Sequence, residues 1–269
     1  MVVWKASAQA GLILTTGNSN GLSVSGAANA SRNDGTNKIT LDVAGAYARS
    51  TVLTPTAAAV AANVIASPSD IAHVTSTTAA NVLGKFRYDR FFTENNSIYG
   101  DVFAGLDDPA GKNLFVGGQA GYRRQIYNSE RNLLAVEVGY DFTYTDYADP
   151  KQAYVILHSA RLYAGYNLTL TKDTALTTSF ETLVNFNSAD VAGIHYGFGA
   201  ATRFTGKTAL TTKLYKNISF RFSFTARYDN APGELPALSV PYATGPMAFT
   251  PLADKLDTIT EAGLVVTFL

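Results

Sequence analysis

The feature that most constrains this chain is an alternation of side chains between Leu114 and Tyr147. One set of alternate positions is apolar and ends in aromatic residues, whereas the other carries Glu, Asp, Arg, Gln and Gly. A period of two places successive side chains on opposite faces of a sheet, so the pattern predicts two strands joined by a turn at residues 128–132. A soluble sandwich would bury the apolar face, and a membrane barrel would turn it toward lipid. The hairpin alone fits both architectures.

The same alternation recurs along the whole chain and predicts twelve strands. Single-chain bacterial outer-membrane barrels have an even number of strands, and twelve satisfies that condition. The approximate strand ranges are 3–15, 22–31, 39–49, 79–92, 98–106, the two strands of the hairpin, 154–171, 175–187, 193–210, 218–228 and 256–268.

The connections between these segments sort by length. Every even-numbered connection is short, and the two long ones, at about 50–78 and 230–254, both fall among the odd-numbered connections. Short periplasmic turns and longer external loops produce this sorting in outer-membrane barrels, and a two-domain soluble sandwich does not. The sequence therefore predicts an all-β fold: one transmembrane antiparallel up-and-down β-barrel of about 12 strands spanning residues 1–269. Within the first long loop, residues 57–65 can form a short helix.

Composition excludes several other classes of protein. The 21 basic and 21 acidic residues cancel, so the chain has no electrostatic footprint for nucleic acid. The absence of cysteine rules out disulfides and thiolate metal sites, and three scattered histidines form no metal constellation, so no cofactor is expected. No run of about 20 apolar residues is present, which excludes a transmembrane helix. The N-terminus lacks a signal-peptide pattern, and we expect a mature bacterial outer-membrane sequence with an added initiator Met.

Aromatic residues gather near the turns, at the ends of the apolar faces. Membrane barrels carry aromatic girdles at both interfaces, where the rings lie at the level of the lipid head groups. We therefore expect outer-membrane lipid and lipopolysaccharide around the wall. The residues assigned to the girdles are Trp4, Phe91, Phe92, Tyr127, Tyr144, Tyr147 and Phe268.

Short motifs distributed along the chain resemble a known family. They are the opening Trp4-Lys5-Ala6-Ser7, the Thr16-Gly17-Asn18 turn, Tyr228-Asp229-Asn230-Ala231-Pro232, and the closing strand from Asp257 to Phe268. In these motifs the chain is similar to an uncharacterised family known as salt-induced outer membrane proteins. The resemblance implies a location and a fold, and no established activity. Barrels of this kind commonly end on an aromatic residue that the barrel-assembly machinery recognises. Phe268 is penultimate here, and the C-terminal strand is expected to engage that machinery.

Charged residues on the predicted inward face are the candidate functional residues. The basic and acidic members are equal in number and alternate in sign from strand to strand between Arg87 and Arg203. Neighbouring strands lie about 4.8 Å apart, so opposite charges at matching heights should pair across the wall, and an unpaired inward charge would be costly. The predicted lumen-lining charges are Lys85, Arg87, Asp89, Asp101, Arg123, Glu137, Asp141, Arg161, Glu181, Arg203, Arg221, Arg227, Asp257 and Glu261.

This pattern supports two functions for a barrel. Salt bridges would rigidify a narrow lumen, and part of the same belt would form a constriction that sorts small solutes by charge. A twelve-strand barrel has space for side chains and a narrow channel, and balanced charge argues against a strong preference for anions or cations. We expect a monomeric, narrow passive pore for small polar solutes, not an enzyme. The alternative is a structural or envelope-stress barrel with a plugged lumen and partner-binding loops.

A lipid-acting enzyme is the third and weakest hypothesis. Some twelve-stranded outer-membrane lipases carry Ser, His and Asn on the outer wall. In this chain His158 and Ser159 are adjacent, so their side chains point to opposite faces and the histidine cannot act as the base for that serine. A Ser or Thr on a neighbouring strand would remain a candidate partner of His158.

Overall fold

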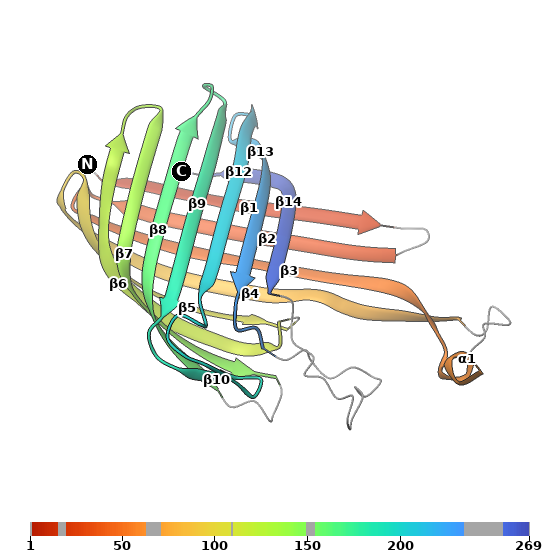
Figure 1. Ribbon diagram of the computed structural model, residues 1–269. Coiled ribbons are helices and arrows are strands. Elements are labelled where there is room, and N and C mark those ends of the chain that lie inside the picture. The colour runs from red at the N-terminus through yellow and green to blue at the C-terminus, as the bar shows by residue number, and fades with distance from the viewer. Residues whose placement is uncertain are drawn as a thin grey trace.

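The computed structural model describes residues 2–15, 20–62, 71–108, 110–148, 154–233 and 255–268. Twelve long strands form a closed antiparallel barrel in which β1 pairs with β14 to complete the wall (Figure 1). The predicted fold class and strand number are therefore confirmed. The strands of the wall are β1 (Val3–Thr15), β2 (Asn20–Asn33), β3 (Asn37–Pro55), β4 (Ile71–Thr93), β5 (Asn96–Asp107), β6 (Lys112–Asn128), β7 (Asn132–Tyr147), β8 (Val155–Thr169), β9 (Thr174–Asn185), β12 (Arg203–Tyr215), β13 (Ile218–Asp229) and β14 (Leu256–Thr267).

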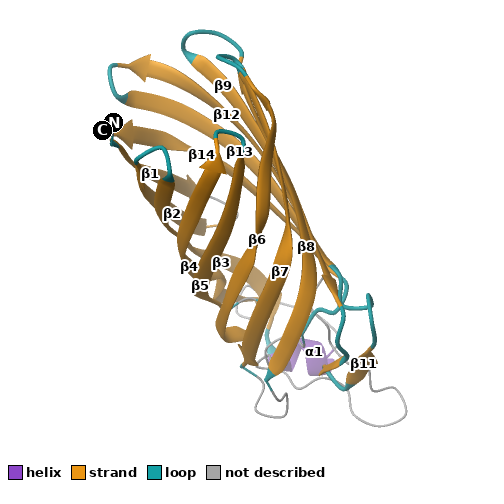
Figure 2. Cartoon of the chain, turned by 90° about the vertical axis from the view of Figure 1, so that its left-hand side faces the viewer, coloured by secondary structure: helices purple, strands orange, loops and turns teal. Residues whose placement is uncertain are grey.

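The short turns and both termini lie at the same end of the barrel. The Thr267 amide donates to the Asn217 carbonyl, and the Phe268 amide donates to the Ala6 carbonyl, so the C-terminal residues lie beside the β12–β13 turn and the start of β1. Figure 2 shows the two termini together at this end, with α1 (Ala57–Ala62) at the other. The longer connections share the end that carries α1.

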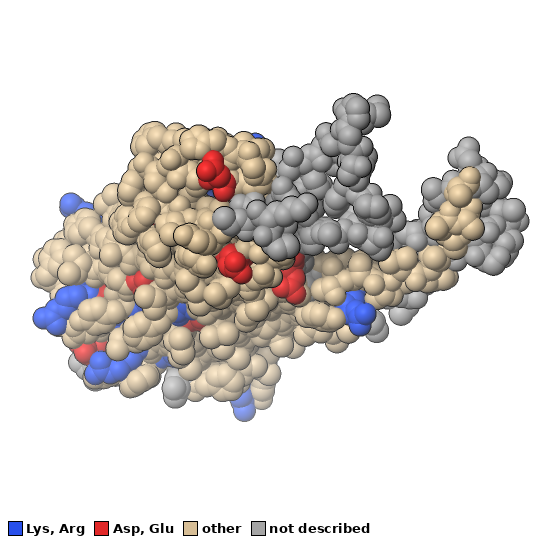
Figure 3. Space-filling view, turned by 90° about the horizontal axis from the view of Figure 1, so that it is seen from below, with Lys and Arg blue, Asp and Glu red and all other residues tan. Residues whose placement is uncertain are grey.

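Apolar side chains cover the outer wall and polar side chains fill the interior. In β5, Ile98 and Val102 are 54% and 59% exposed, whereas Ser97 and Asp101 at the intervening register are buried. In Figure 3, Lys and Arg gather mainly toward the left of the view, the side of the N-terminus, and most of the visible surface carries no charged side chain. This arrangement is the reverse of a soluble sandwich and matches a lipid-embedded barrel. Among the described residues, no helix is long and apolar enough to cross a membrane.

The first predicted long loop, at 50–78, is largely strand. β3 continues to Pro55 and β4 begins at Ile71, and the hydroxyls of Thr51 and Thr75 are 2.6 Å apart across the pair. Thr and Val in this segment suit extended strands. The register of the β3–β4 pair shifts at Ala48, however, and this shift interrupts the alternation from which the strand ends were predicted. The predicted helix is present as α1, and residues 63–70 lie outside the described part.

The predicted strand at 193–210 begins ten residues later, at Arg203. The preceding segment instead forms a small hairpin, β10 (Ala189–Val191) and β11 (Ile194–Tyr196), whose turn has Ala192 and Gly193 at positive φ. A left-handed residue suits a tight turn and interrupts an extended strand. Of the second predicted long loop, 230–254, residues 234–254 lie outside the described part.

The Asn33-Asp34-Gly35 sequence forms the β2–β3 turn as predicted. Gly35 has a φ of 91°, and its amide donates to the Asn33 side-chain oxygen at 2.8 Å. The Asp34 carboxylate accepts from the Asn37 amide at 2.7 Å and from the Thr36 amide at 3.1 Å. Hydrogen bonds to the charged form, led by the one from the Asn37 backbone, lower the pKa of Asp34 to about 2.

Tyr99 on β5 occupies space that two facing glycines keep open. Gly121 of β6 and Gly139 of β7 are register partners, and a Cβ atom added at either would lie 2.8 Å or 2.6 Å from the Tyr99 hydroxyl oxygen. It would lie closer still to a backbone carbonyl oxygen of the paired strand, that of Val138 or Ala120. That hydroxyl accepts a hydrogen bond from Arg161 Nη1 at 2.7 Å, so Tyr99 cannot move away without losing this bond. Gly121 and Gly139 are therefore packing sites beside a large inward side chain.

Replacing Gly139 by alanine should destabilise the barrel by about 1–3 kcal/mol, because the added methyl group overpacks against the Ala120 carbonyl oxygen and the Tyr99 hydroxyl. Gly206→Ala on β12 is the matched control, since a Cβ there meets no atom within 4 Å. Urea unfolding from phospholipid vesicles, followed by the fluorescence of Trp4, the single tryptophan, measures the difference. Equal losses in the two variants would contradict the packing role of Gly139.

Candidate functional site

Glu137 on β7 is the centre of a buried ion-pair network inside the barrel. Its Oε1 lies 2.8 Å from Arg87 Nη2, and its Oε2 lies 2.7 Å from Arg161 Nη1. Arg123 on β6 approaches more loosely, with its Nε 3.9 Å from Glu137 Oε1. The Glu137 side chain is 2% exposed, and the close pairing with two guanidinium groups makes its burial tolerable.

The same arginines bind further partners around this centre. Arg87 Nη2 lies 2.7 Å from Asp89 Oδ1, and Arg161 Nε lies 2.5 Å from Glu181 Oε1. The Arg87 guanidinium lies over the Tyr99 ring, 4.2 Å from its centroid. Such a network fixes long side chains in one arrangement because each guanidinium is held from more than one side.

A second cluster lies around Asp141, closer to the end that carries the longer connections. Asp141 accepts from Gln119 Nε2 at 2.9 Å, from Thr143 Oγ1 at 2.9 Å and from Arg203 Nη2 at 3.1 Å. Gln119 also joins a neighbouring ion pair, because Lys85 Nζ donates to its Oε1 at 3.1 Å. Lys85 itself pairs with Asp101 at 3.0 Å.

Several of these contacts cross the lumen. In the wall, β4 and β7 are separated by β5 and β6, yet Arg87 reaches Glu137. Arg203 on β12 likewise reaches Asp141 on β7 across β8 and β9. One half of the interior is therefore filled by side chains that connect strands three positions apart in the wall.

The predicted charge belt is present in part. Arg123, Glu137, Arg161 and Glu181 follow one another through ion pairs in the expected order. The expected contact of Asp101 with Arg87 is replaced by one with Lys85, and Arg87 pairs with Asp89 on its own strand and with Glu137. Arg203 pairs with Asp141, three strands away in the wall, rather than with Glu181 on the next strand. The other predicted charges that line interior cavities are Arg221, Arg227 and Glu261, whereas the Asp257 side chain lies outside the described part.

Two inward lysines were absent from the predicted set. Lys38 was missed because the strand was expected to start at Ile39, one residue later, although Lys38 shares the parity of Asp42. Lys207 shares the parity of Arg203 on β12, and the same alternation could have identified it.

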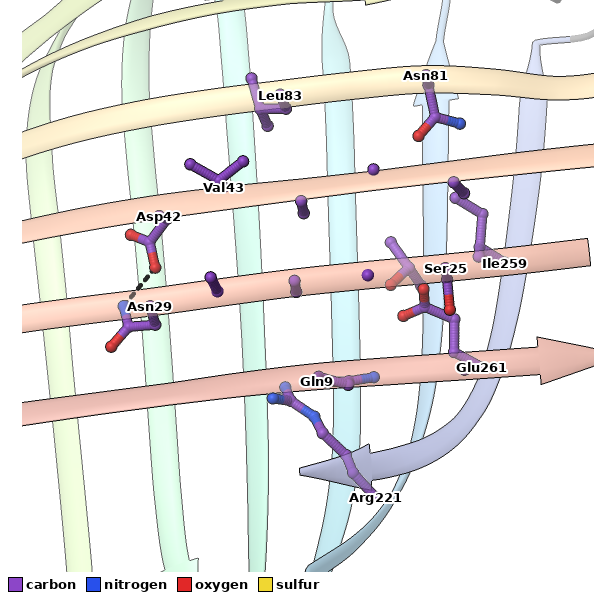
Figure 4. A pocket seen from close by; sticks show the side chains of 18 of the residues that line it. Gln9, Ser25, Asn29, Asp42, Val43, Asn81, Leu83, Arg221, Ile259 and Glu261 are labelled. Atoms are coloured by element: carbon purple, nitrogen blue, oxygen red, sulfur yellow. Dashed lines mark hydrogen bonds between the residues drawn. The ribbon is translucent and has the colours of Figure 1, made fainter. Parts of the chain in front are cut away.

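The other half of the interior is open because short side chains face inward from β1, β2 and β3. Two cavities of about 580 and 440 Å³ lie along it, and both are lined by Asp42, Lys85, Lys207 and Arg221. The smaller one also borders the ion-pair network, at Arg87, Glu137 and Arg161. Figure 4 shows Arg221 and Glu261 projecting from β13 and β14 beside the short side chains of β2. The ionisable groups lining the two cavities are eight basic residues, Lys38, Lys85, Arg87, Arg123, Arg161, Lys207, Arg221 and Arg227, and four acidic residues, Asp42, Asp89, Glu137 and Glu261.

An apolar cluster lies at the end of the barrel that carries the longer connections. Tyr147 of β7 and Val155 of β8 pack with Val191 of β10 and with Ala201 and Ala231 of the connecting segments. Asn185 anchors the β9–β12 connection, because its side chain donates to the Gly197 carbonyl at 2.9 Å and accepts from the Ala201 amide at 2.8 Å. The connection therefore folds inward over part of the mouth.

Two residues assigned to the aromatic girdles belong to the inner face. Tyr147 is buried in the apolar cluster, and Phe91 pairs in register with the buried Ser97. The assignment relied on nearness to turns and ignored that Phe91 and Phe92 must point to opposite faces. The girdle residues that are exposed or ring-stacked on the outer side are Trp4, Phe92 (stacked on Tyr122), Tyr127, Tyr144 (stacked on Tyr154) and Phe268.

His158 lies on the outer wall, away from the ion pairs. Its Nδ1 is 2.6 Å from the Tyr140 hydroxyl, and its ring packs beside Phe142 and Phe186, whereas Ser159 is buried on the inner face. This histidine therefore contacts a phenol and aromatic rings. Within the described ranges, no group of three or more His, Asp or Glu side chains could hold a metal ion.

Comparison with known proteins identifies one family model and several barrels. The model described as "Protein of unknown function, DUF481" matches residues 8–268. The NanC porin matches with a TM-score of 0.50 at 7% identity, covering 98% of this chain and 100% of that one. The translocator domain of the autotransporter NalP from Neisseria meningitidis gives 0.43 at 12% identity, covering 100% and 88%. The outer membrane channel DcaP of Acinetobacter baumannii gives 0.39 at 9% identity, covering 99% and 96%. No curated protein matches.

Replacing Glu137 by glutamine should cost about 3 kcal/mol of stability, because it removes the charge between Arg87 and Arg161 while leaving both cations in place. Glu94→Gln, in the exposed β4–β5 turn, is the control and should stay within about 0.5 kcal/mol. Urea unfolding from vesicles measures both. A loss at Glu137 no larger than that at Glu94 would contradict the role of Glu137 as the centre of the network.

Proposed function

Because the chain belongs to the DUF481 family of proteins of unknown function and folds as an outer-membrane type of β-barrel, we propose that it is a narrow passive pore for small polar solutes. The observation that carries this proposal is the pair of cavities in the open half of the lumen. They share four lining residues, Asp42, Lys85, Lys207 and Arg221, and so adjoin each other inside the wall.

The two cavities follow one another along β3. Lys38, Thr40 and Asp42 line the cavity toward the short turns, and Asp42, Ala44 and Ala46 line the one farther along the strand. A strand rises about 3.3 Å per residue, so this order corresponds to a path along the wall rather than across it. Asp42, Lys85, Lys207 and Arg221, which line both cavities, lie at the junction between them.

The filled half of the lumen would serve such a pore as a rigid wall. The Glu137 and Asp141 clusters hold long arginine side chains by ion pairs on several sides, so these side chains are restrained from swinging into the open half. A pore of fixed width needs this restraint, because a lumen of a twelve-strand barrel leaves little space beside its side chains.

We propose that the barrel lies in the bacterial outer membrane, with the short turns toward the periplasm and lipid and lipopolysaccharide around the exposed apolar wall. In this arrangement the C-terminal strand with Phe268 would engage the barrel-assembly machinery, and the protein would act as a monomer. The similarity of short motifs to salt-induced outer membrane proteins supports an envelope role within the same compartment.

A structural barrel with a plugged lumen is the second candidate. The observations that favour it are the cross-lumen ion pairs and the apolar cluster around Tyr147, which covers part of the mouth. Such a barrel would present its longer connections to a surface partner. The two candidates differ in whether ions pass through the folded protein.

The refolded protein in a planar bilayer should show steady single-channel openings in potassium chloride that a larger organic salt reduces or abolishes. Folding and insertion are verified independently by heat-modifiable migration in gels. A silent bilayer with correctly folded, inserted protein would overturn the pore and support the plugged barrel.

Filling the open half should reduce this current. Ala44→Phe adds a ring to the wall of the larger cavity, and conductance should fall about twofold or more. Ala30→Phe, on the exposed face of β2, is the control and should conduct like the unchanged protein. An undiminished current in folded Ala44→Phe would show that ions do not pass through this cavity.

A further inference from the structure

The cations that line the two cavities fall into a paired group and an unpaired group. Arg87 and Arg161 are paired with Glu137, and Lys85 with Asp101. In contrast, Lys207 and Arg221 form no ion pair or hydrogen bond among the described residues, and the buried Nε of Arg221 has no acceptor. The unpaired positive groups are thus concentrated along the cavities.

The acidic groups in the open half are already engaged by neutral donors. Asp42 accepts a hydrogen bond from the Asn29 side-chain amide, and Glu261 accepts from the Ser223 hydroxyl at 3.1 Å. Neither forms an ion pair with a described cation. The larger cavity, away from the Glu137 network, is lined by four basic side chains, Lys85, Lys207, Arg221 and Arg227, and by two acidic ones, Asp42 and Glu261, although the whole chain has no net charge.

The unpaired cations also lie close to one another. Lys207 is within Coulombic range of Arg221 and Arg227 as well as of the carboxylates of Glu261 and Asp42. Lys38, on the other side, is within range of Arg123 and Arg87 as well as of Asp89. Like charges held in a partly desolvated lumen repel one another, and a mobile anion between them lowers that energy. Rings of Lys or Arg are also how pores favour anions.

We propose that the passage selects anions and that Lys207 and Arg221 form its binding site for small carboxylates. This inference rests on the proposed pore. The Arg221 guanidinium can offer two parallel N–H donors to a carboxylate, and Lys207 supplies a compact positive charge beside it. Gln9, Ser7 and Ser25 line the same cavity and provide uncharged hydrogen-bonding groups for the rest of a polar solute.

This inference departs from the expectation of a lumen without charge preference. That expectation counted all inward charges as equivalent. The structure separates the inward cations that a carboxylate neutralises, such as Arg87 and Arg161, from Lys207 and Arg221, whose charge is left for a passing solute.

The test is the reversal potential of single channels in a potassium chloride gradient, for the unchanged protein and for Lys207→Gln, Arg221→Gln and the double variant. The reversal potential of the unchanged pore should be shifted from zero toward the chloride equilibrium potential. The chloride-to-potassium permeability ratio should fall about threefold or more in the double variant. Acetate added to one side should reduce the chloride current in the unchanged pore and much less in the double variant. Lys172→Gln, in the exposed β8–β9 turn, is the matched control and should leave both readouts unchanged.

The outcomes separate this inference from the proposal on which it rests. Folded, inserted protein without openings overturns the pore itself. Steady openings whose reversal potential is zero, or is shifted toward the potassium equilibrium potential, leave the pore intact and overturn anion selection. Anion selection that persists unchanged in the double variant overturns the assignment of Lys207 and Arg221, as does acetate block that is equal in all variants.

Discussion

A carboxylate whose side chain is 2% exposed is tolerable inside a barrel only when cations surround it, and Glu137 meets this condition with Arg87 and Arg161. Because the outer wall faces lipid, the polar side chains of every strand must be accommodated within the lumen. The ion pairs of Glu137 accommodate inward charged side chains of β4, β6, β7 and β8 together. Arg87 and Arg161 extend the network by also pairing with Asp89 and Glu181. This centre, together with the separate Asp141 cluster, fills one half of the barrel.

The open half depends on the opposite choice of side chains. Long arginine and tyrosine side chains of β4 to β8 fill one half of the lumen. The short side chains of β1, β2 and β3 leave the other half open. The glycine pair beside Tyr99 is a smaller example of the same complementarity, since glycines on neighbouring strands leave space for this large inward side chain. An asymmetric lumen lets a small barrel be rigid and still leave space for solute.

Alternation along the sequence was sufficient to predict the fold, since a period of two is a local property of each strand. It could not reveal that Arg87 reaches Glu137 or that Arg203 reaches Asp141, because those contacts depend on the diameter of the closed barrel and on the reach of long side chains. It also failed where the register shifts near Ala48 and where the turn at Ala192 and Gly193 interrupts a strand-like pattern. Lys207, by contrast, was identifiable from parity alone.

β3 and β4 extend beyond the rest of the wall, so their outer hydrogen bonds can open separately from those of the barrel. β2 pairs with β3 only as far as Thr51, and β5 pairs with β4 only from Asn81, whereas β3 and β4 pair with each other out to Pro55 and Ile71. Their outer part is therefore a two-stranded ribbon, which on its own has marginal stability in water. Its hydrogen bonds form a local cooperative unit that opens and recloses without disturbing the ion-paired interior, so amide exchange there is decoupled from unfolding of the barrel.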